Sequence, residues 1–124
     1  MLLALLLAAT GAQAVMTGDF DRDGRIDRVF VAKDGDKHKI MISRSLFSDT
    51  VVVENHVDVG PDFKFNKVKR ENRRTVCDFA SLSRYVCDAG DVLQYGNGVE
   101  SAMAVWNGQR FIVYRPPVGN SAAR

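Results

Sequence analysis

Hydrophobic and polar residues alternate along much of this chain with the period of two that is typical of half-buried β-strands. In residues 37–44, Ile40 and Ile42 are separated by a single residue and flanked by Lys39 and Ser43. Similar runs, rich in β-branched and aromatic residues, recur at short intervals. They predict strands over residues 27–33, 37–44, 49–57, 62–70, 91–95, 101–106 and 109–115.

Turn residues between these runs predict that neighbouring strands pair as hairpins. Asp34-Gly35 separates the first two runs, and Asn107-Gly108 separates the last two. We expect a type I′ turn at Asn107-Gly108, because both residues tolerate the positive φ that this turn requires. Only residues 78–86 have a sequence suited to a helix. The sequence therefore predicts an all-β fold, a small antiparallel sheet or sandwich of about six to eight strands with at most one short helix.

The two ends of the chain depart from this pattern. Residues 2–9 are an apolar run too short to span a bilayer, and Ala-Gln-Ala at 12–14 is a sequence that a signal peptidase could cleave. No Lys or Arg precedes the apolar run, and an N-terminal core element is the alternative interpretation. We expect a signal peptide over residues 1–14, a single β-domain over 15–124 and a disordered tail from about residue 117. The protein would then be exported, either periplasmic or secreted.

Export changes the interpretation of the two cysteines, Cys77 and Cys87. An even number of cysteines in an oxidising compartment predicts a disulfide. A zinc site is the alternative, but the two histidines, His38 and His56, are distant in sequence and lack ligand spacing. We therefore expect a structural disulfide between Cys77 and Cys87.

The stretch GDFDRDGRID, residues 18–27, places four aspartates around one glycine. Its spacing, D-x-D-x-D-G-x-x-D, suits Ca²⁺, a hard cation that takes six to eight oxygen ligands. Carboxylates at alternate positions converge when the chain wraps around an ion, and a glycine at the sixth position permits the sharp turn. The predicted ligands of one structural calcium ion are the side chains of Asp19, Asp21, Asp23 and Asp27 and the backbone carbonyl of Arg25.

An EF-hand would need a glutamate at the twelfth position of this loop and helices on both sides, whereas Phe30 and predicted strands are found here. The segment GDFDRDGRIDRVFVA instead resembles the calcium loop of FG-GAP and VCBS-type repeats, the units of integrin-like β-propellers and of many exported bacterial proteins. In those repeats a GDFDGDGxxD loop leads into a hydrophobic strand. The resemblance implies calcium coordination by the residues named above. One copy cannot close a propeller, which takes at least four blades.

Two further expectations concern the same loop. Ile26, at its eighth position, is expected to point inward and to tie the loop to the core. Arg22, Arg25 and Arg28 add positive charge, so that ion pairs with the aspartates could hold the loop without metal. The sequence leaves both a calcium-bound and a metal-free loop open.

A second concentration of charge is the segment KVKRENRR, residues 67–74, in a chain whose formal net charge is only +2. The pattern suits a solvated loop before Cys77, which we favour, or a surface for an anionic polysaccharide, lipid head groups or nucleic acid. Aromatic residues do not interleave with the basic ones, so we expect no nucleic-acid partner. The charged residues of the segment are Lys67, Lys69, Arg70, Arg73 and Arg74, with Glu71 opposing them.

The sequence offers little support for catalysis, because no Gly-x-Ser-x-Gly nucleophile motif is present. We expect a calcium-stabilised module that does not span a membrane and that binds an unidentified protein or glycan or has a structural role. The alternative is a small exported enzyme whose calcium loop braces a cleft at His38, Asp91 and Glu100. A lone repeat with open sheet edges also predicts an edge-to-edge homodimer.

Overall fold

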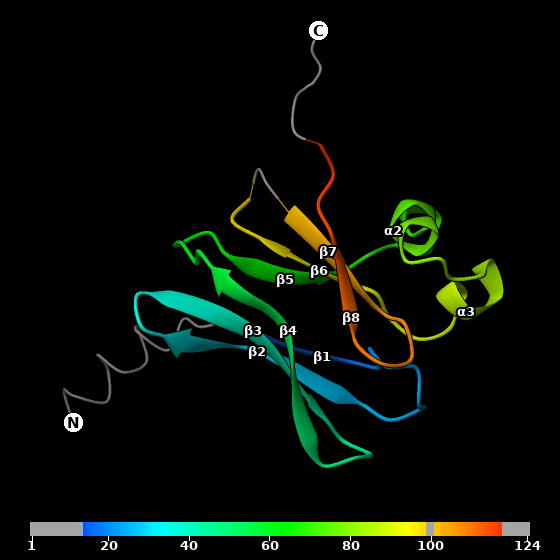
Figure 1. Ribbon diagram of the computed structural model, residues 1–124, viewed down its shortest axis with the longest axis horizontal. Coiled ribbons are helices and arrows are strands. Elements are labelled where there is room, and N and C mark those ends of the chain that lie inside the picture. Colours follow the sequence, from blue (N-terminus) through cyan, green and yellow to red (C-terminus); the bar gives the residue numbers. More distant parts are fainter. Residues whose placement is uncertain (1–13, 99–100, 118–124) are drawn as a thin grey trace, which may run out of the picture.

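The computed structural model describes residues 14–98 and 101–117, which form two four-stranded antiparallel sheets (Figure 1). Each sheet is a meander in which neighbouring strands follow one another along the chain. The first sheet contains β1 (Val15–Gly18), β2 (Asp27–Asp34), β3 (Lys37–Arg44) and β4 (Asp49–Val57). The second contains β5 (Lys64–Lys67), β6 (Leu93–Gly96), β7 (Ser101–Trp106) and β8 (Phe111–Tyr114). The predicted all-β class and the antiparallel hairpins are confirmed.

The segment between β5 and β6 holds the helical structure of the described residues: a 3-10 turn, η1 (Arg70–Asn72), and two short helices, α2 (Arg74–Phe79) and α3 (Arg84–Asp88). At most one helix is predicted, so this prediction is wrong. A residue with positive φ, Ser81, follows α2, and the Ser83 side chain accepts a hydrogen bond from the Val86 backbone N–H and caps α3. The predicted strand over 62–70 is correspondingly shortened to β5.

Two further local predictions need correction. The hydrophobic pattern does not reveal β1, because it has only four residues and follows directly on the predicted leader. Asn107-Gly108 does not form a type I′ turn, since Trp106 pairs with Phe111 across a four-residue loop and Asn107 does not take a positive φ. The Asn107 side chain instead accepts hydrogen bonds from the backbone N–H groups two and three residues ahead.

The main core lies between the two sheets, where the inward-facing side chains of both sheets meet. Val29, Ile40 and Ile42 come from the first sheet, and Leu93 and Tyr95 from the second. A smaller core lies on the other face of the second sheet, which α2 and α3 cover as Figure 1 shows at its right. The helical segment therefore covers part of the outer face of the second sheet, where α2 packs on β7 and β8, whereas the outward-facing Lys64 and Asn66 of β5 are exposed.

The predicted disulfide is present. Cys77 in α2 and Cys87 in α3 are bonded, with Cα atoms 6.0 Å apart, and both are buried in the smaller core. It closes a loop of ten residues that contains the junction between the two helices. Residues 1–13 of the predicted signal peptide lie outside the described residues, as does nearly all of the predicted tail, whereas Ala14 packs against the main core. Among the helices that are described, none has the length and apolar character needed to cross a membrane.

Replacement of both cysteines by alanine should lower the free energy of unfolding by about 2–3 kcal/mol, because the open chain regains the entropy that the disulfide removes from the unfolded state. Urea unfolding of Cys77→Ala/Cys87→Ala and of the oxidised protein measures the difference. Wild-type protein in reducing agent is the control and should match the double variant. An unchanged midpoint would show that the disulfide contributes nothing to stability.

Candidate metal centre

The aspartate-rich loop connects β1 to β2 and lies where the two sheets meet. Phe20, 1% exposed, anchors it in the main core. Ile26 does not take this role, contrary to our prediction, since it is 62% exposed. Phe20, which lies between Asp19 and Asp21, therefore fixes the loop to the core. The chain enters the loop from a strand and keeps the strand period of two for one more residue, so the Phe20 side chain points inward.

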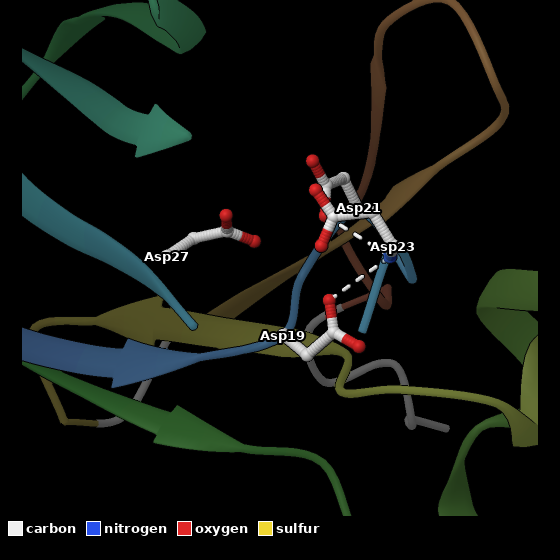
Figure 2. Close-up of side chains that lie close together, drawn as sticks. All are labelled: Asp19, Asp21, Asp23 and Asp27. Carbon is white, nitrogen blue, oxygen red and sulfur yellow. Dashed lines mark hydrogen bonds between the residues drawn. The ribbon is translucent and has the colours of Figure 1, made fainter. Parts of the chain in front are cut away.

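Four carboxylates converge in this loop. Asp19, Asp21, Asp23 and Asp27 each offer an oxygen, and these oxygens lie within 4.8 Å of one another. Figure 2 shows the Asp27 carboxylate pointing from the start of β2 toward those of the loop. Oxygens on opposite sides of a calcium ion are about 4.6–5.2 Å apart, since each Ca–O distance is about 2.3–2.6 Å. The spacing of the four oxygens therefore matches the coordination sphere of calcium.

Backbone N–H groups of the loop hold three of these carboxylates. Asp19 accepts hydrogen bonds from Asp23 N (3.1 Å) and Gly24 N (3.1 Å), and Asp21 accepts from Asp23 N (3.3 Å). Asp23 Oδ1 accepts from Arg25 N (2.8 Å), so the chain reverses around the cluster. Gly24 has φ +87°, which a residue with a side chain rarely adopts, and it therefore allows this reversal.

Asp27 is the most deeply buried of the four, with 1% of its surface exposed. Its oxygens accept hydrogen bonds from Phe20 N (3.0 Å) and Ser45 N (3.2 Å), which tie the loop to the β3–β4 turn. Burial and the nearby Asp21 charge raise the pKa of Asp27 to about 6, although the two N–H groups oppose the shift. Carboxylates as close as those of Asp21 and Asp27, whose oxygens lie within 4.8 Å, require a proton or a cation between them.

Arg44, at the end of β3, supplies a positive charge to the cluster. Its Nε lies 2.9 Å from Asp21 Oδ2, and its guanidinium stacks on the rings of Phe47 (4.1 Å) and Trp106 (4.6 Å). Burial alone would raise the pKa of Asp21, but the hydrogen bond from Arg44 leaves this pKa below its ordinary value. Asp21 is therefore the ionised member of the pair and Asp27 the one that takes up a proton.

The arginines expected to pair with the aspartates of a metal-free loop lie beyond ion-pair distance of them, although the charge of Arg22 acts on Asp19 and Asp21 at longer range. Among the described residues, Arg22, Arg25 and Arg28 form no ion pair with the four aspartates. Arg22 donates from Nη2 to the Trp106 carbonyl oxygen, and Arg28 stacks on the ring of Phe30. The prediction that these three arginines form ion pairs with the aspartates is therefore wrong. Among the described residues, the ion pair of the four-aspartate cluster is made by Arg44.

One carboxylate oxygen of the cluster has no partner. Asp23 Oδ2 is buried and has no hydrogen bond in the part of the chain described here. A buried, unpaired carboxylate oxygen costs free energy that a bound cation would recover. The donor set therefore fits calcium: hard carboxylate oxygens, a matching spacing and one oxygen without a partner.

The loop is also fixed to the second sheet. Asp19 N donates to Asp91 Oδ2 (2.8 Å), and Asp91 N donates to the Asp19 carbonyl oxygen (2.9 Å). At Gly90, just before Asp91, a Cβ atom would lie 2.7 Å from the Asp19 carbonyl oxygen and 2.7 Å from Arg22 Cγ. Only glycine allows this approach, so residues 90–91 position the loop from the opposite sheet.

The alternative catalytic cleft receives no support from this arrangement. Asp91 contacts the loop, near Arg44, whereas His38 lies six residues before Arg44 on β3, about 20 Å away along an extended strand. Glu100 lies outside the described residues. His38 therefore lies at the end of the first sheet that is remote from the loop and from Asp91, and the two residues do not form one site.

Sequence reasoning missed Phe20, Arg44 and the bracing role of Asp91. The signal for Phe20 is present, because it continues the alternation of β1 across the first acidic residue. No local signal marks Arg44 or Asp91, since Arg44 reaches the loop through the pairing of β2 with β3 and Asp91 through the contact between the two sheets.

Comparisons of this chain with protein-family models, curated proteins and solved structures found no match. The resemblance to FG-GAP and VCBS-type calcium loops therefore stays a prediction based on the residues of the loop.

Metal-free protein should lose stability as the pH rises from about 4 to about 6. Asp27 binds a proton more tightly in the folded protein, where its pKa is about 6, than in the unfolded chain, where the value is 3.8. The bound proton thus favours the folded state below this window, by at most about 3 kcal/mol. Urea unfolding in chelator at several pH values measures the loss.

The variant Asp27→Asn isolates this effect, because an amide does not titrate. The difference in stability between the wild type and this variant should change over pH 4–6 and be flat above about pH 7. A difference that is constant from pH 4 to 7 would show that Asp27 does not take up the proton.

Proposed function

We propose that the loop of residues 19–27 binds one calcium ion and that this protein is an exported module stabilised by that ion. The observation that carries the proposal is the convergence of four carboxylates, with Asp23 Oδ2 buried and unpaired. The ligands would be Asp19, Asp21, Asp23, Asp27 and the backbone carbonyl of Arg25.

The charge of the cluster supports a divalent ion. Four ionised carboxylates beside the guanidinium of Arg44, which pairs with Asp21, and that of Arg22, which acts on Asp19 and Asp21 at longer range, leave an excess of two negative charges. Protonation of Asp27 removes one of these, and a calcium ion that displaces this proton would remove two. Calcium is thus the better counter-ion above about pH 6, where the proton is lost.

The position of the loop indicates what the ion would do. The loop contacts the β3–β4 turn through Asp27 and the second sheet through Asp19 and Arg22. An ion that fixes the loop would therefore stabilise the contact between the sheets. Extracellular modules bind calcium at about 10⁻⁴–10⁻³ M, and at that affinity the ion is a permanent structural component outside the cell.

The role of the module is to bind a protein or a glycan or to support a larger assembly. The edge strands of the two sheets are neighbours, with β4 beside β8 and β1 beside β5, so each sheet edge has the other sheet close to it. The edge-to-edge homodimer stays a prediction, which light scattering of the purified chain tests.

Calcium should raise the midpoint of thermal unfolding relative to EGTA, because the ion binds the folded loop and not the unfolded chain. At a calcium concentration 100 times the dissociation constant, the gain in free energy of unfolding is about 2.7 kcal/mol. Terbium, a luminescent substitute for calcium, should be sensitised by the single tryptophan, Trp106, whose ring contacts Arg44 beside Asp21.

The double variant Asp21→Asn/Asp23→Asn should lose both the calcium-dependent rise and the terbium emission. The matched control, Asp34→Asn/Asp36→Asn, removes two exposed carboxylates at the β2–β3 turn and should keep both responses. A calcium response that survives the loop variant would place the ion elsewhere, and the absence of any response in the wild type would refute the proposal.

A further inference from the structure

A cleft of about 480 Å³ lies beside the disulfide, lined by residues of η1, α2 and α3. This cleft is remote in sequence from the calcium loop and takes no part in its chemistry. Four arginines line it: Arg70, Arg73, Arg74 and Arg84. Three carboxylate side chains, those of Glu71, Asp78 and Asp88, also line it, so the cleft has an excess of one positive charge.

Arg73 is the unusual member of this group, because its side chain is buried and the residue is only 6% exposed. Its Nε donates to the Val68 carbonyl oxygen (3.1 Å), and its Nη1 donates to the carbonyl oxygens of Cys87 (3.1 Å) and Gly90 (3.1 Å). No carboxylate of the described residues lies within ion-pair distance. The carbonyls therefore orient this guanidinium, and its Nη2 takes no part in these bonds. Among the described residues, the carboxylates that act on its charge, Asp91 and Asp88, lie beyond ion-pair distance.

The neighbouring arginines add to this charge. Arg70, Arg74 and Arg84 are exposed, and none forms an ion pair with the carboxylates of the cleft in the described part of the chain. Burial is the main reason that the pKa of Arg73 lies below its ordinary value; the charges of Asp91 and Asp88 oppose this shift, and the charge of Arg70 adds to it. Like charges that converge on one cleft are stabilised by an anion bound between them.

We propose that this cleft binds the oxyanion group of a small ligand, a carboxylate, sulfate or phosphate, with Arg73 at its buried wall and Arg74 and Arg84 at its exposed rim. Arg73 can donate to such a group from Nη2, since its Nε and Nη1 are bonded to carbonyl oxygens, whereas Arg74 and Arg84 can each donate two parallel hydrogen bonds through the planar guanidinium. Sugar acids, sulfated sugars and phosphate esters all carry this chemistry, and the probes below distinguish them.

Titration of the full chain with sodium phosphate, sodium sulfate and sodium glucuronate, at constant ionic strength and in EGTA, tests the proposal. At least one probe should cause saturable shifts in the backbone amide NMR signals of residues that line the cleft, such as Cys77 and Cys87. The probe that binds most tightly identifies the preferred oxyanion. The variant Arg74→Gln/Arg84→Gln should weaken its binding by at least tenfold, because both exposed charges at the rim are lost.

Two controls keep the result interpretable. Lys33→Gln/Arg110→Gln also removes two exposed positive charges, both outside the cleft, and should leave binding unchanged. Asp21→Asn/Asp23→Asn should also bind the anion as the wild type does, so failure of the calcium proposal and failure of this one are separable. The proposal is overturned by the absence of saturable shifts with all three probes, by undiminished binding in the cleft variant, or by an equal loss in the charge control.

Discussion

Carboxylates within 4.8 Å of one another repel unless hydrogen bonds, a proton or a cation offset their charge, and the loop of residues 19–27 contains four of them. The structure meets this constraint in several ways at once. Backbone N–H groups reach Asp19, Asp21 and Asp23, a guanidinium pairs with Asp21, and burial leaves Asp27 ready to hold a proton. Within residues 14–98 and 101–117, Asp23 Oδ2 has no hydrogen-bond partner, which is the strongest structural reason to place a cation there.

The same constraint explains how the two sheets are joined. None of the groups that stabilise the cluster from outside the loop is close to it in sequence: Ser45 follows β3, Asp91 precedes β6, and Arg44 stacks on Trp106 at the end of β7. The two groups from outside the loop that offset carboxylate charge, the Ser45 N–H and the Arg44 guanidinium, therefore also connect distant parts of the chain, as does the Asp91 carboxylate that holds the Asp19 N–H. The free energy of the loop and that of the sandwich are linked for this reason, and a change in the charge of the cluster should affect the whole fold.

The two charged sites of this protein have opposite sign and share one segment. Gly90 accepts a hydrogen bond from Arg73 through its carbonyl oxygen, and its lack of a side chain allows Arg22 and Asp19 to approach. The next residue, Asp91, braces the loop and lies 3.7 Å from Lys67 Nζ. The disulfide-linked helices and the acidic loop thus meet at residues 90–91, which explains why a short connection without regular structure carries so many polar contacts.

The sequence by itself determined the features that depend on neighbours along the chain. Alternation at Ile40 and Ile42 identifies β3, a pair of cysteines predicts the disulfide, and the spacing of the aspartates predicts a site where oxygens converge. Local patterns suffice here because strand periodicity and loop closure act over a few residues. They fail where another local conformation is adopted: the Asn107 side chain caps a longer loop, and the positive φ of Ser81 divides the expected helix in two.

Tertiary structure alone decided which arginine pairs with the aspartates and which arginine is buried. Arg22, Arg25 and Arg28 are close to the acidic residues in sequence, yet strand pairing brings Arg44 to Asp21 instead. Within the basic segment, only Arg73 is turned inward, because the carbonyl groups of Val68, Cys87 and Gly90 surround its guanidinium. Charge pairing follows distance in space, and in an all-β fold that distance is set by strand register and not by position along the chain.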